Sequence, residues 1–212
     1  MFAKAISRPT LKALDLIAVQ RLLPPAVYLA GGTAVALHMA HRYSYDLDFF
    51  TPRRFDARAL AEKLKRFPKF RLDRVARGTV LGFLGDTQVS VFFYRYPLLF
   101  SVHDFRGIAV ADLRDIAAMK IAALSDRGKK RDFIDMYFIL REGITTMEEA
   151  MYLYGKKFAV LDANRVHIIR SLCYFDDAEA ERTPRMIKNV NWLGVKKFFI
   201  AEQKKLMQRI IG

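Results

Sequence analysis

Residues 29–50 read LAGGTAVALHMAHRYSYDLDFF, with paired glycines at 31 and 32 and two aspartates at 46 and 48. The apolar run 26–30 is typical of a buried strand, and 33–42 repeats its apolar residues with helical spacing. Residues 45–50 alternate like a second strand, which Pro52 closes. The stretch therefore predicts a strand, a glycine turn, a helix and a second strand, in that order.

The two aspartates predict a metal site. Asp46 and Asp48 alternate with Leu47 and Phe49, so on one strand both carboxylates project from the same face, about 6.6 Å apart at a rise of roughly 3.3 Å per residue. Oxygen ligands are what Mg²⁺ prefers, and two Mg²⁺ ions can hold the attacking and leaving oxygens of a phosphoryl displacement. The apolar neighbours indicate burial, where paired carboxylates repel unless a cation compensates them.

The paired glycines predict a phosphate loop beside those acids. Gly31 and Gly32 let the backbone approach an anion, and a helix that starts at Thr33 directs free amides and its positive dipole end at a phosphate. The Thr33 hydroxyl could add a donor.

Charge points to a polyanionic partner. The chain holds 36 basic and 22 acidic residues, a net charge of +14. The segment from Arg53 to Arg77 contains ten basic residues and only three acidic ones. Such a face suits RNA or a nucleoside triphosphate; the alternative is a solvated helix face in a basic protein.

Composition limits the class of protein. The 212 residues suffice for one sizeable domain or a catalytic core with a helical appendage. The single cysteine, Cys173, excludes an internal disulfide and a thiolate-rich zinc site, which favours a reducing compartment. Residues 1–10 hold no signal-peptide core, and no apolar run is long enough for a membrane span. We expect a cytoplasmic protein.

The remaining pattern predicts an α+β fold: a mixed β-sheet flanked by helices, followed by a helical C-terminal part. We place a soft boundary between residues 1–106 and 107–212. The predicted helices are 10–23, 33–42, 56–67, 112–125, 132–141, 147–157, 164–174 and 195–211, and the predicted strands are 26–30, 45–50, 69–76, 79–84, 88–94 and 107–110. Asp56 and Asp112 are the expected helix caps, with Asp115 completing a capping box.

Gly31-Gly-Thr33 followed by Asp46-Leu-Asp-Phe-Phe50 resembles the signature of polymerase-beta-type nucleotidyltransferases. With Met119-Lys120, Arg127-Gly128 and Lys130-Arg-Asp-Phe-Ile-Asp-Met-Tyr137, the chain resembles more closely the AbiEii/AbiGii toxin family of that superfamily. The resemblance covers roughly residues 28–140 and implies a nucleotidyltransferase fold that uses Mg²⁺ and a nucleoside triphosphate. It also implies a toxin of an abortive-infection or toxin–antitoxin system, with an antitoxin partner and with transfer to an RNA such as a tRNA 3′ end.

The resemblance also implies residue roles. Asp46 and Asp48 would bind metal, and Gly31, Gly32 and Thr33 would hold phosphate. Lys120, Arg127 and Lys130 would contact the nucleotide, and Asp132 and Asp135 would complete the catalytic set. From the residues alone, Lys120 either meets an anion or reaches solvent. Asp132 either presents an oxygen to a base or metal or caps its helix, and Asp135 alternatively pairs with Arg131 or Arg127.

One departure concerns the third carboxylate that many nucleotidyltransferases carry on a later strand. Residues 88–94 offer only Gln88 and Ser90 on alternate positions. Three explanations are open: Asp132 or Asp135 replaces the missing carboxylate, Asp86 replaces it from the turn, or the catalytic rate is low.

Several other polar and aromatic residues receive structural interpretations. His38 and His41 are assigned to a polar helix face, and Asp176 and Asp177 to a loop or cap. The aromatic residues Phe92, Phe93, Tyr94, Tyr96 and Phe100 are assigned to core packing rather than to base stacking.

The sequence thus predicts a metal-dependent nucleotidyltransferase that moves a nucleoside monophosphate to a hydroxyl, with RNA as the favoured acceptor. The alternatives are a catalytically degenerate domain that binds nucleotide, RNA or a partner protein, and a transferase that modifies a protein side chain.

Overall fold

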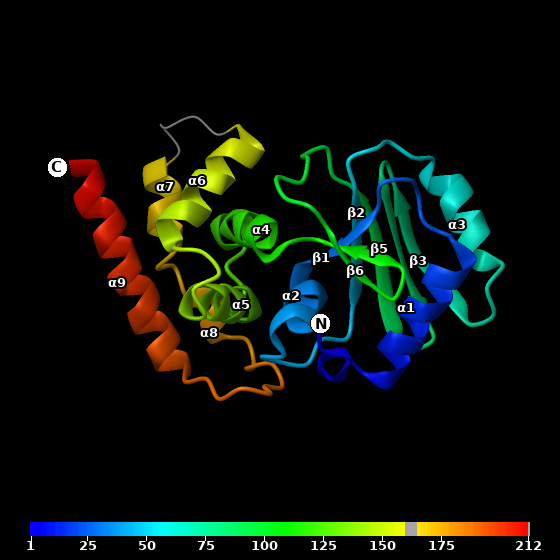
Figure 1. Ribbon diagram of the computed structural model, residues 1–212, viewed down its shortest axis with the longest axis horizontal. Coiled ribbons are helices and arrows are strands. Elements are labelled where there is room, and N and C mark those ends of the chain that lie inside the picture. Colours follow the sequence, from blue (N-terminus) through cyan, green and yellow to red (C-terminus); the bar gives the residue numbers. More distant parts are fainter. Residues whose placement is uncertain (160–164, 212) are drawn as a thin grey trace. The chain divides into compact units, whose positions relative to one another are not determined.

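The computed structural model describes residues 1–159 and 165–211, and of 210 and 211 only the helical backbone. The chain divides into two compact units, Met1–Asp112 and Leu113–Gly212 (Figure 1). The first unit is a mixed β-sheet with helices, and the described part of the second is built from helices. This arrangement confirms the predicted α+β class. The division falls after the last strand, so residues 107–112 belong with the sheet.

The first unit holds one seven-stranded sheet in the order β3-β4-β5-β2-β1-β7-β6. β2 lies in its middle, antiparallel to β1 and parallel to β5. The strands are β1 (Tyr28–Ala30), β2 (Leu47–Thr51), β3 (Phe70–Ala76), β4 (Thr79–Leu84), β5 (Thr87–Phe93), β6 (His103–Phe105) and β7 (Ile108–Val110). The hairpin turns at Arg77-Gly78 and Gly85-Asp86 are confirmed, whereas β6 escaped prediction because it is short and polar.

Strand alternation gives the sheet two different faces. Leu47, Phe49 and Thr51 of β2 are fully buried, whereas Asp48 and Phe50, which point to the other face, are only half-buried. The helices α1 (Arg8–Gln20) and α3 (Ala57–Lys65) lie on the same side of the sheet in Figure 1. α1 contacts the Leu47 face, since Thr10 lies beside Thr87, which shares that face with Val89 and Val91.

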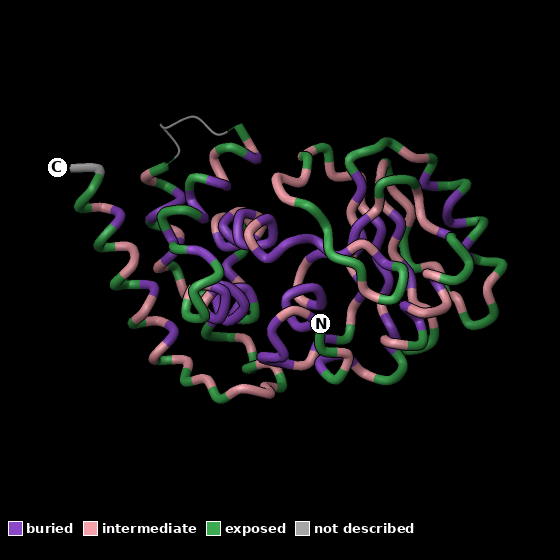
Figure 2. Tube along the Cα trace, in the orientation of Figure 1, coloured by how far each residue is buried: buried purple, intermediate pink, exposed green. Residues whose placement is uncertain are grey.

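The remaining helices of this unit are the 3₁₀ turn η1 (Ala3–Ala5) and α2 (Gly31–Met39). α2 follows β1 without a linker and begins at Gly31, two residues earlier than predicted. Residues 33–37 of this helix are all buried (Figure 2). Asp56 caps α3 as predicted, because its carboxylate accepts hydrogen bonds from the amides of Arg58 and Ala59.

The second unit comprises α4 (Leu113–Asp126), α5 (Lys130–Arg141), α6 (Met147–Phe158), α7 (Arg165–Ser171), α8 (Asp176–Glu179) and α9 (Trp192–Ile211). α4 packs against α5, α6 and α7, and α9 packs against α5 and α7. The buried Phe133 ring lies 5.0 Å from that of Phe175 and 5.1 Å from that of Phe199, so aromatic packing joins three segments.

The predicted start of α7 at Asn164 lies outside the described residues. The assignment of Asp176 and Asp177 to a loop or cap is wrong, because they form the first turn of α8, whose N-cap is Phe175. No helix in the described part of the chain is long and apolar enough to cross a membrane.

Candidate active site

The predicted phosphate loop and one predicted metal ligand lie side by side. Gly31 has a φ of +69°, and a β-carbon added there would lie 3.2 Å from Asp48 Oδ2. The pairing of Ala30 with Asp48 in the β1–β2 ladder sets this proximity, because Gly31 follows Ala30 directly. Glycine is needed here because the positive φ disfavours any side chain. The Asp48 carboxylate therefore lies beside the first residue of α2, where backbone amides lack helical partners.

Thr33 fixes the second aspartate by its backbone. Its buried hydroxyl donates to the Asp46 carbonyl oxygen and lies 2.8 Å from Ser44 Oγ. Thr33 was predicted to donate to a phosphate, but its hydroxyl is engaged within the protein. The side chain thus positions the segment that carries Asp46 against the first turn of α2.

Asp46 itself precedes β2, which begins at Leu47 rather than at Tyr45. Strand alternation therefore does not set the direction of its side chain, and the expectation that both carboxylates share a face stays a prediction. Asp46 and Asp48 are both half-buried.

An all-oxygen donor pair of this kind fits Mg²⁺, which keeps several waters and binds through one or two carboxylates plus substrate phosphates. Among the described residues, no group of three or more His, Cys, Asp and Glu side chains could hold a metal by itself.

The strand next to β2 carries no carboxylate opposite Asp48. The parallel β2–β5 register pairs Asp48 with Ser90, and Leu47 with Val89. Asp86 does not replace the missing acid, because it lines a pocket with Arg8 and Lys12 of α1, on the opposite side of the sheet from Asp48. This position argues against the alternative in which Asp86 moves in from the turn.

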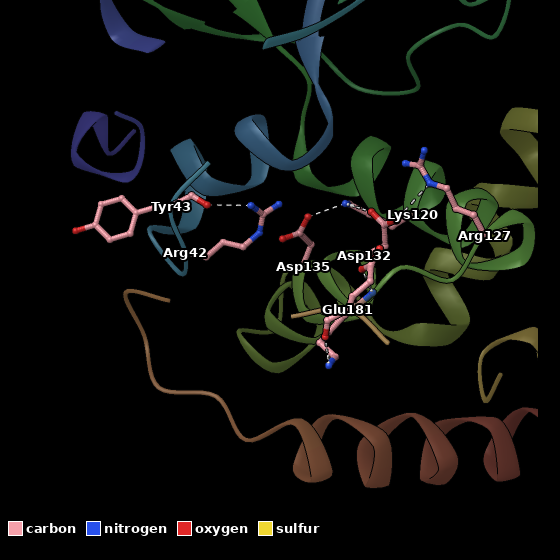
Figure 3. Close-up of polar contacts among 8 residues, drawn as sticks. Arg42, Tyr43, Lys120, Arg127, Asp132, Asp135 and Glu181 are labelled. Atoms are coloured by element: carbon pink, nitrogen blue, oxygen red, sulfur yellow. Dashed lines mark hydrogen bonds and ion pairs between the residues drawn. The ribbon is translucent and has the colours of Figure 1, made fainter. Parts of the chain in front are cut away.

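Lys120 forms a buried cluster of three charges within the second unit, together with Asp132 and Asp135 of α5. Its ammonium donates to Asp132 Oδ1 and to Asp135 Oδ2, each at 2.6 Å (Figure 3). The side chain of Lys120 is 7% exposed, so the alternative that it reaches solvent is wrong. The anions that it meets are protein carboxylates. Lys129 occupies the N-cap of α5, so the alternative that Asp132 caps this helix is also wrong.

The two other predicted nucleotide contacts of this unit differ from each other. The side chain of Arg127 is half-exposed, with Nε 3.6 Å from Asp132 Oδ2, so its outer nitrogens face away from the cluster (Figure 3). Lys130 is buried, donates to the Glu181 carbonyl oxygen and lies 5.1 Å from the centre of the Trp192 ring. This burial argues against the predicted nucleotide contact of Lys130.

The histidines form no polar helix face, which corrects the prediction. His38 Nε2 lies 2.9 Å from the Ala111 carbonyl oxygen, and burial lowers the pKa of its imidazole. His41 follows the end of α2 and is fully buried. His103 lies edge-on to His38 and is 3.0 Å from the Asp112 carboxylate. The sequence offered no signal for this cluster, because β6 was not predicted.

Asp115 is a further charged residue whose partner the sequence did not reveal. Its carboxylate accepts a 2.8 Å hydrogen bond from Lys157 of α6, and both side chains are fully buried. Its place in a capping box with Asp112 stays a prediction.

Comparison with known proteins agrees with these features. Residues 13–100 and 94–209 match the family described as "Nucleotidyl transferase AbiEii toxin, Type IV TA system". An uncharacterized protein from Aquifex aeolicus is 34% identical over 187 residues, which is 85% of this chain and 88% of that protein.

Solved structures share the fold. MenT4, a nucleotidyltransferase toxin from Mycobacterium tuberculosis, gives a TM-score of 0.60 at 17% identity, over 92% of this chain and 82% of its own. JHP933 from Helicobacter pylori gives a TM-score of 0.52 at 19% identity, over 96% of both chains. The family model matches most of the chain, and the Gly31–Asp48 arrangement agrees with it. The chain therefore belongs to the AbiEii family of nucleotidyltransferase toxins.

Proposed function

We propose that this nucleotidyltransferase transfers a nucleoside monophosphate from a triphosphate to a hydroxyl of RNA, such as a tRNA 3′ end, in a Mg²⁺-dependent reaction. The observation that carries the proposal is the proximity of Asp48 to Gly31, which brings a carboxylate beside the first residue of a helix. A triphosphate with its cation needs both groups at one place, because the amides attract phosphate oxygens and the carboxylate attracts the metal.

The site residues of the first unit have distinct roles in this proposal. Asp46 and Asp48 would hold Mg²⁺, which neutralises phosphate charge and orients the reacting oxygens when bound. The backbone at Gly31 and Gly32 would receive the triphosphate, since only glycine admits so close an approach. Thr33 keeps Asp46 in place, because its hydroxyl donates a hydrogen bond to the Asp46 carbonyl oxygen. Catalysis is then mainly positional and electrostatic, as in phosphoryl transfer generally.

The second motif of the family supports roles for Lys120, Asp132, Asp135 and Arg127 as well. The three-charge cluster keeps Lys120 and both carboxylates ordered within the second unit, and we propose Asp132 or Asp135 as the carboxylate of this motif that acts as a base. The half-exposed Arg127 is the cation of this unit that we assign to the nucleotide.

RNA is the favoured acceptor because of charge. The net charge of +14 suits a polyanion, and the basic segment 53–77 lies on exposed parts of the first unit. In a toxin–antitoxin system this activity would be restrained by an antitoxin partner in the cytoplasm.

The test is to incubate the purified protein with each labelled nucleoside triphosphate, Mg²⁺ and total tRNA. We expect label on the RNA 3′ end, and loss of labelling in Asp48→Asn and after chelation of the metal. Absence of label on RNA and on any added protein, across the four nucleotides, would overturn the proposal. Label on a protein instead would support transfer to a side chain.

A second candidate follows from Ser90, which lies opposite Asp48 where an acid was expected. Without that acid the domain could bind nucleotide or RNA without turnover. Calorimetry separates the two functions: Mg²⁺-dependent binding of triphosphate without transfer, unchanged by Asp132→Asn and Asp135→Asn, would favour the degenerate domain.

A further inference from the structure

We propose that the sheet face carrying Asp48 is also the binding surface for the single-stranded end of the acceptor RNA. This face combines an aromatic cluster for stacking bases with arginines for phosphates. The inference rests on the proposed function and adds a surface to it. It departs from the sequence interpretation, which assigned these aromatic residues to the core.

The strand registers place the surface. One row across the sheet runs from Asp48 through Ser90 and Leu81 to Arg74, crossing β2, β5, β4 and β3. The next row runs from Tyr28 through Phe50 and Phe92 to Thr79. Paired residues of neighbouring strands point to the same face. Asp48, Phe50, Phe92 and Arg74 therefore share the face opposite to Leu47.

The aromatic cluster begins two residues from the proposed metal ligand. The Phe50 ring lies 5.3 Å from the rings of both Phe92 and Tyr94, and Tyr94 lies 5.1 Å from Tyr96. All four side chains are half-buried rather than buried. Tyr28, which stacks on Phe50 from β1, is fully buried, so the cluster leaves the core at Phe50, and its outer rings keep part of their surface available to solvent or to a base.

The arginines lie on the outer strand of the same face. Arg71 pairs with Phe83, and its guanidinium lies 4.6 Å from the centre of that ring. Arg74 pairs with Leu81 in the row of Asp48. Both arginines are exposed. A guanidinium that rests on a ring is oriented in advance and still presents donors to a phosphate.

The charge and the rings together select the occupant. The exposed Arg71 and Arg74 of this face favour a polyanion, and aromatic faces add affinity only if the polyanion exposes flat groups. Bases of a duplex are stacked inside it, so a single-stranded RNA end fits both features. An acidic protein would use the arginines without needing the rings.

The experiment measures binding apart from catalysis. Asp48→Asn protein, without nucleotide or Mg²⁺, is titrated against a labelled RNA hairpin that ends in a short single-stranded 3′ overhang, and against the same hairpin with a blunt end. Phe92→Leu is compared with Phe93→Leu, because the two residues are adjacent on β5, are both half-buried, and point to opposite faces. The double variant Arg71→Gln/Arg74→Gln is compared with a second double variant, Arg58→Gln/Arg66→Gln. The second one removes exposed charges on and beside α3 instead.

We expect Phe92→Leu to weaken overhang binding by about fivefold or more, with little change for the blunt hairpin or in Phe93→Leu. The β3 arginine pair should lower the salt slope by about 2, and the α3 pair by less. Equal affinity for overhang and blunt hairpins, equal effects of Phe92→Leu and Phe93→Leu, or full competition by polyglutamate would overturn the inference.

A second readout covers a variant that fails to fold. In the protein that carries only Asp48→Asn, 4-thiouridine at the overhang should crosslink to β2 or to residues 92–96, and adducts confined to other segments would overturn the inference. If the substitutions on this face leave the rate of transfer to RNA unchanged, the proposed surface is refuted but the proposed function is not. If overhang binding is weakened by the substitutions on this face but the unaltered protein transfers no nucleotide, the proposed function is refuted but the surface is not.

Discussion

Gly31 and Asp48 lie side by side where the β1–β2 ladder ends, and a β-carbon added to Gly31 would lie 3.2 Å from the Asp48 carboxylate oxygen. We expect Gly31→Ala to lower nucleotidyl transfer by roughly tenfold or more, because the methyl group pushes aside the oxygen that we propose binds the metal, and a small misplacement is costly in catalysis. Initial rates with saturating triphosphate measure the effect.

Gly85→Ala is the matched control. Gly85 also has a positive φ, +61°, but a β-carbon there meets nothing within 4 Å. Both substitutions carry the conformational cost of the left-handed region, about 1–2 kcal/mol. Equal stability losses with an activity loss confined to Gly31→Ala would assign the effect to the Asp48 contact, whereas parallel activity losses would contradict it.

Asp48→Asn should lower the transfer rate by roughly a thousandfold or more, because the amide keeps the shape and loses the charge that the cation needs. Asp86→Asn should leave the rate within about twofold, since Asp86 lies with Arg8 and Lys12 on the other side of the sheet. A large loss in Asp86→Asn would show that this residue does supply the missing acid.

Removal of the Lys120 ammonium should destabilise the second unit. Lys120→Met leaves Asp132 and Asp135 buried without their shared cation, and breaking such a cluster costs about 3–5 kcal/mol. Urea denaturation measures the loss. Adding Asp132→Asn and Asp135→Asn to Lys120→Met should restore part of the stability, and a triple variant weaker than the single variant would refute the charge argument.

The Lys157–Asp115 pair gives an independent test of buried charge. Both side chains are fully buried, so Asp115→Ala should cost about 3–5 kcal/mol of unfolding free energy. Glu62→Ala, which breaks the exposed pair with Lys65, serves as the control and should leave the urea midpoint nearly unchanged. Similar shifts for the two variants would mean that burial does not set the cost.

Cys173 should react slowly with alkylating reagents. Burial raises the pKa of its thiol to about 11, so the reactive thiolate is about one part in a thousand at pH 8. The alkylation rate of the folded protein should rise about tenfold per pH unit between pH 8 and 10. The urea-unfolded chain should react far faster at pH 8. A plateau near pH 9 in the folded protein would contradict the raised pKa.

The sequence predicts much of this fold because its signals are local. Asp56 caps α3 where the pattern places it, and β4 has the predicted bounds. The proximity of the glycines to Asp48 was also predicted, because a strand, a turn and a returning strand leave little choice of geometry. β6 could not be predicted, because a three-residue polar strand is stabilised by its partner β7 and not by its own composition.

The partners of charged residues were less predictable, since they depend on which helices meet. Asp115 has a partner, Lys157 of α6, that lies forty-two positions away and that no local pattern could indicate. The helical spacing of Asp132 and Asp135 gave their shared face, yet only the packing of α4 against α5 placed Lys120 between them. Likewise, alternation separates the two faces of β5 but does not tell which one α1 covers.

The outer strand β3 has one more consequence. It ends the sheet on one side, and an unpaired strand edge invites pairing with another copy of the chain. The register of β3 shifts between Leu72 and Arg74, and Arg71, Asp73 and Arg74 are all exposed on it. An irregular, charged border of this kind resists edge-to-edge aggregation. The arginines that we assign to RNA would thus also help to keep the molecule monodisperse at high concentration.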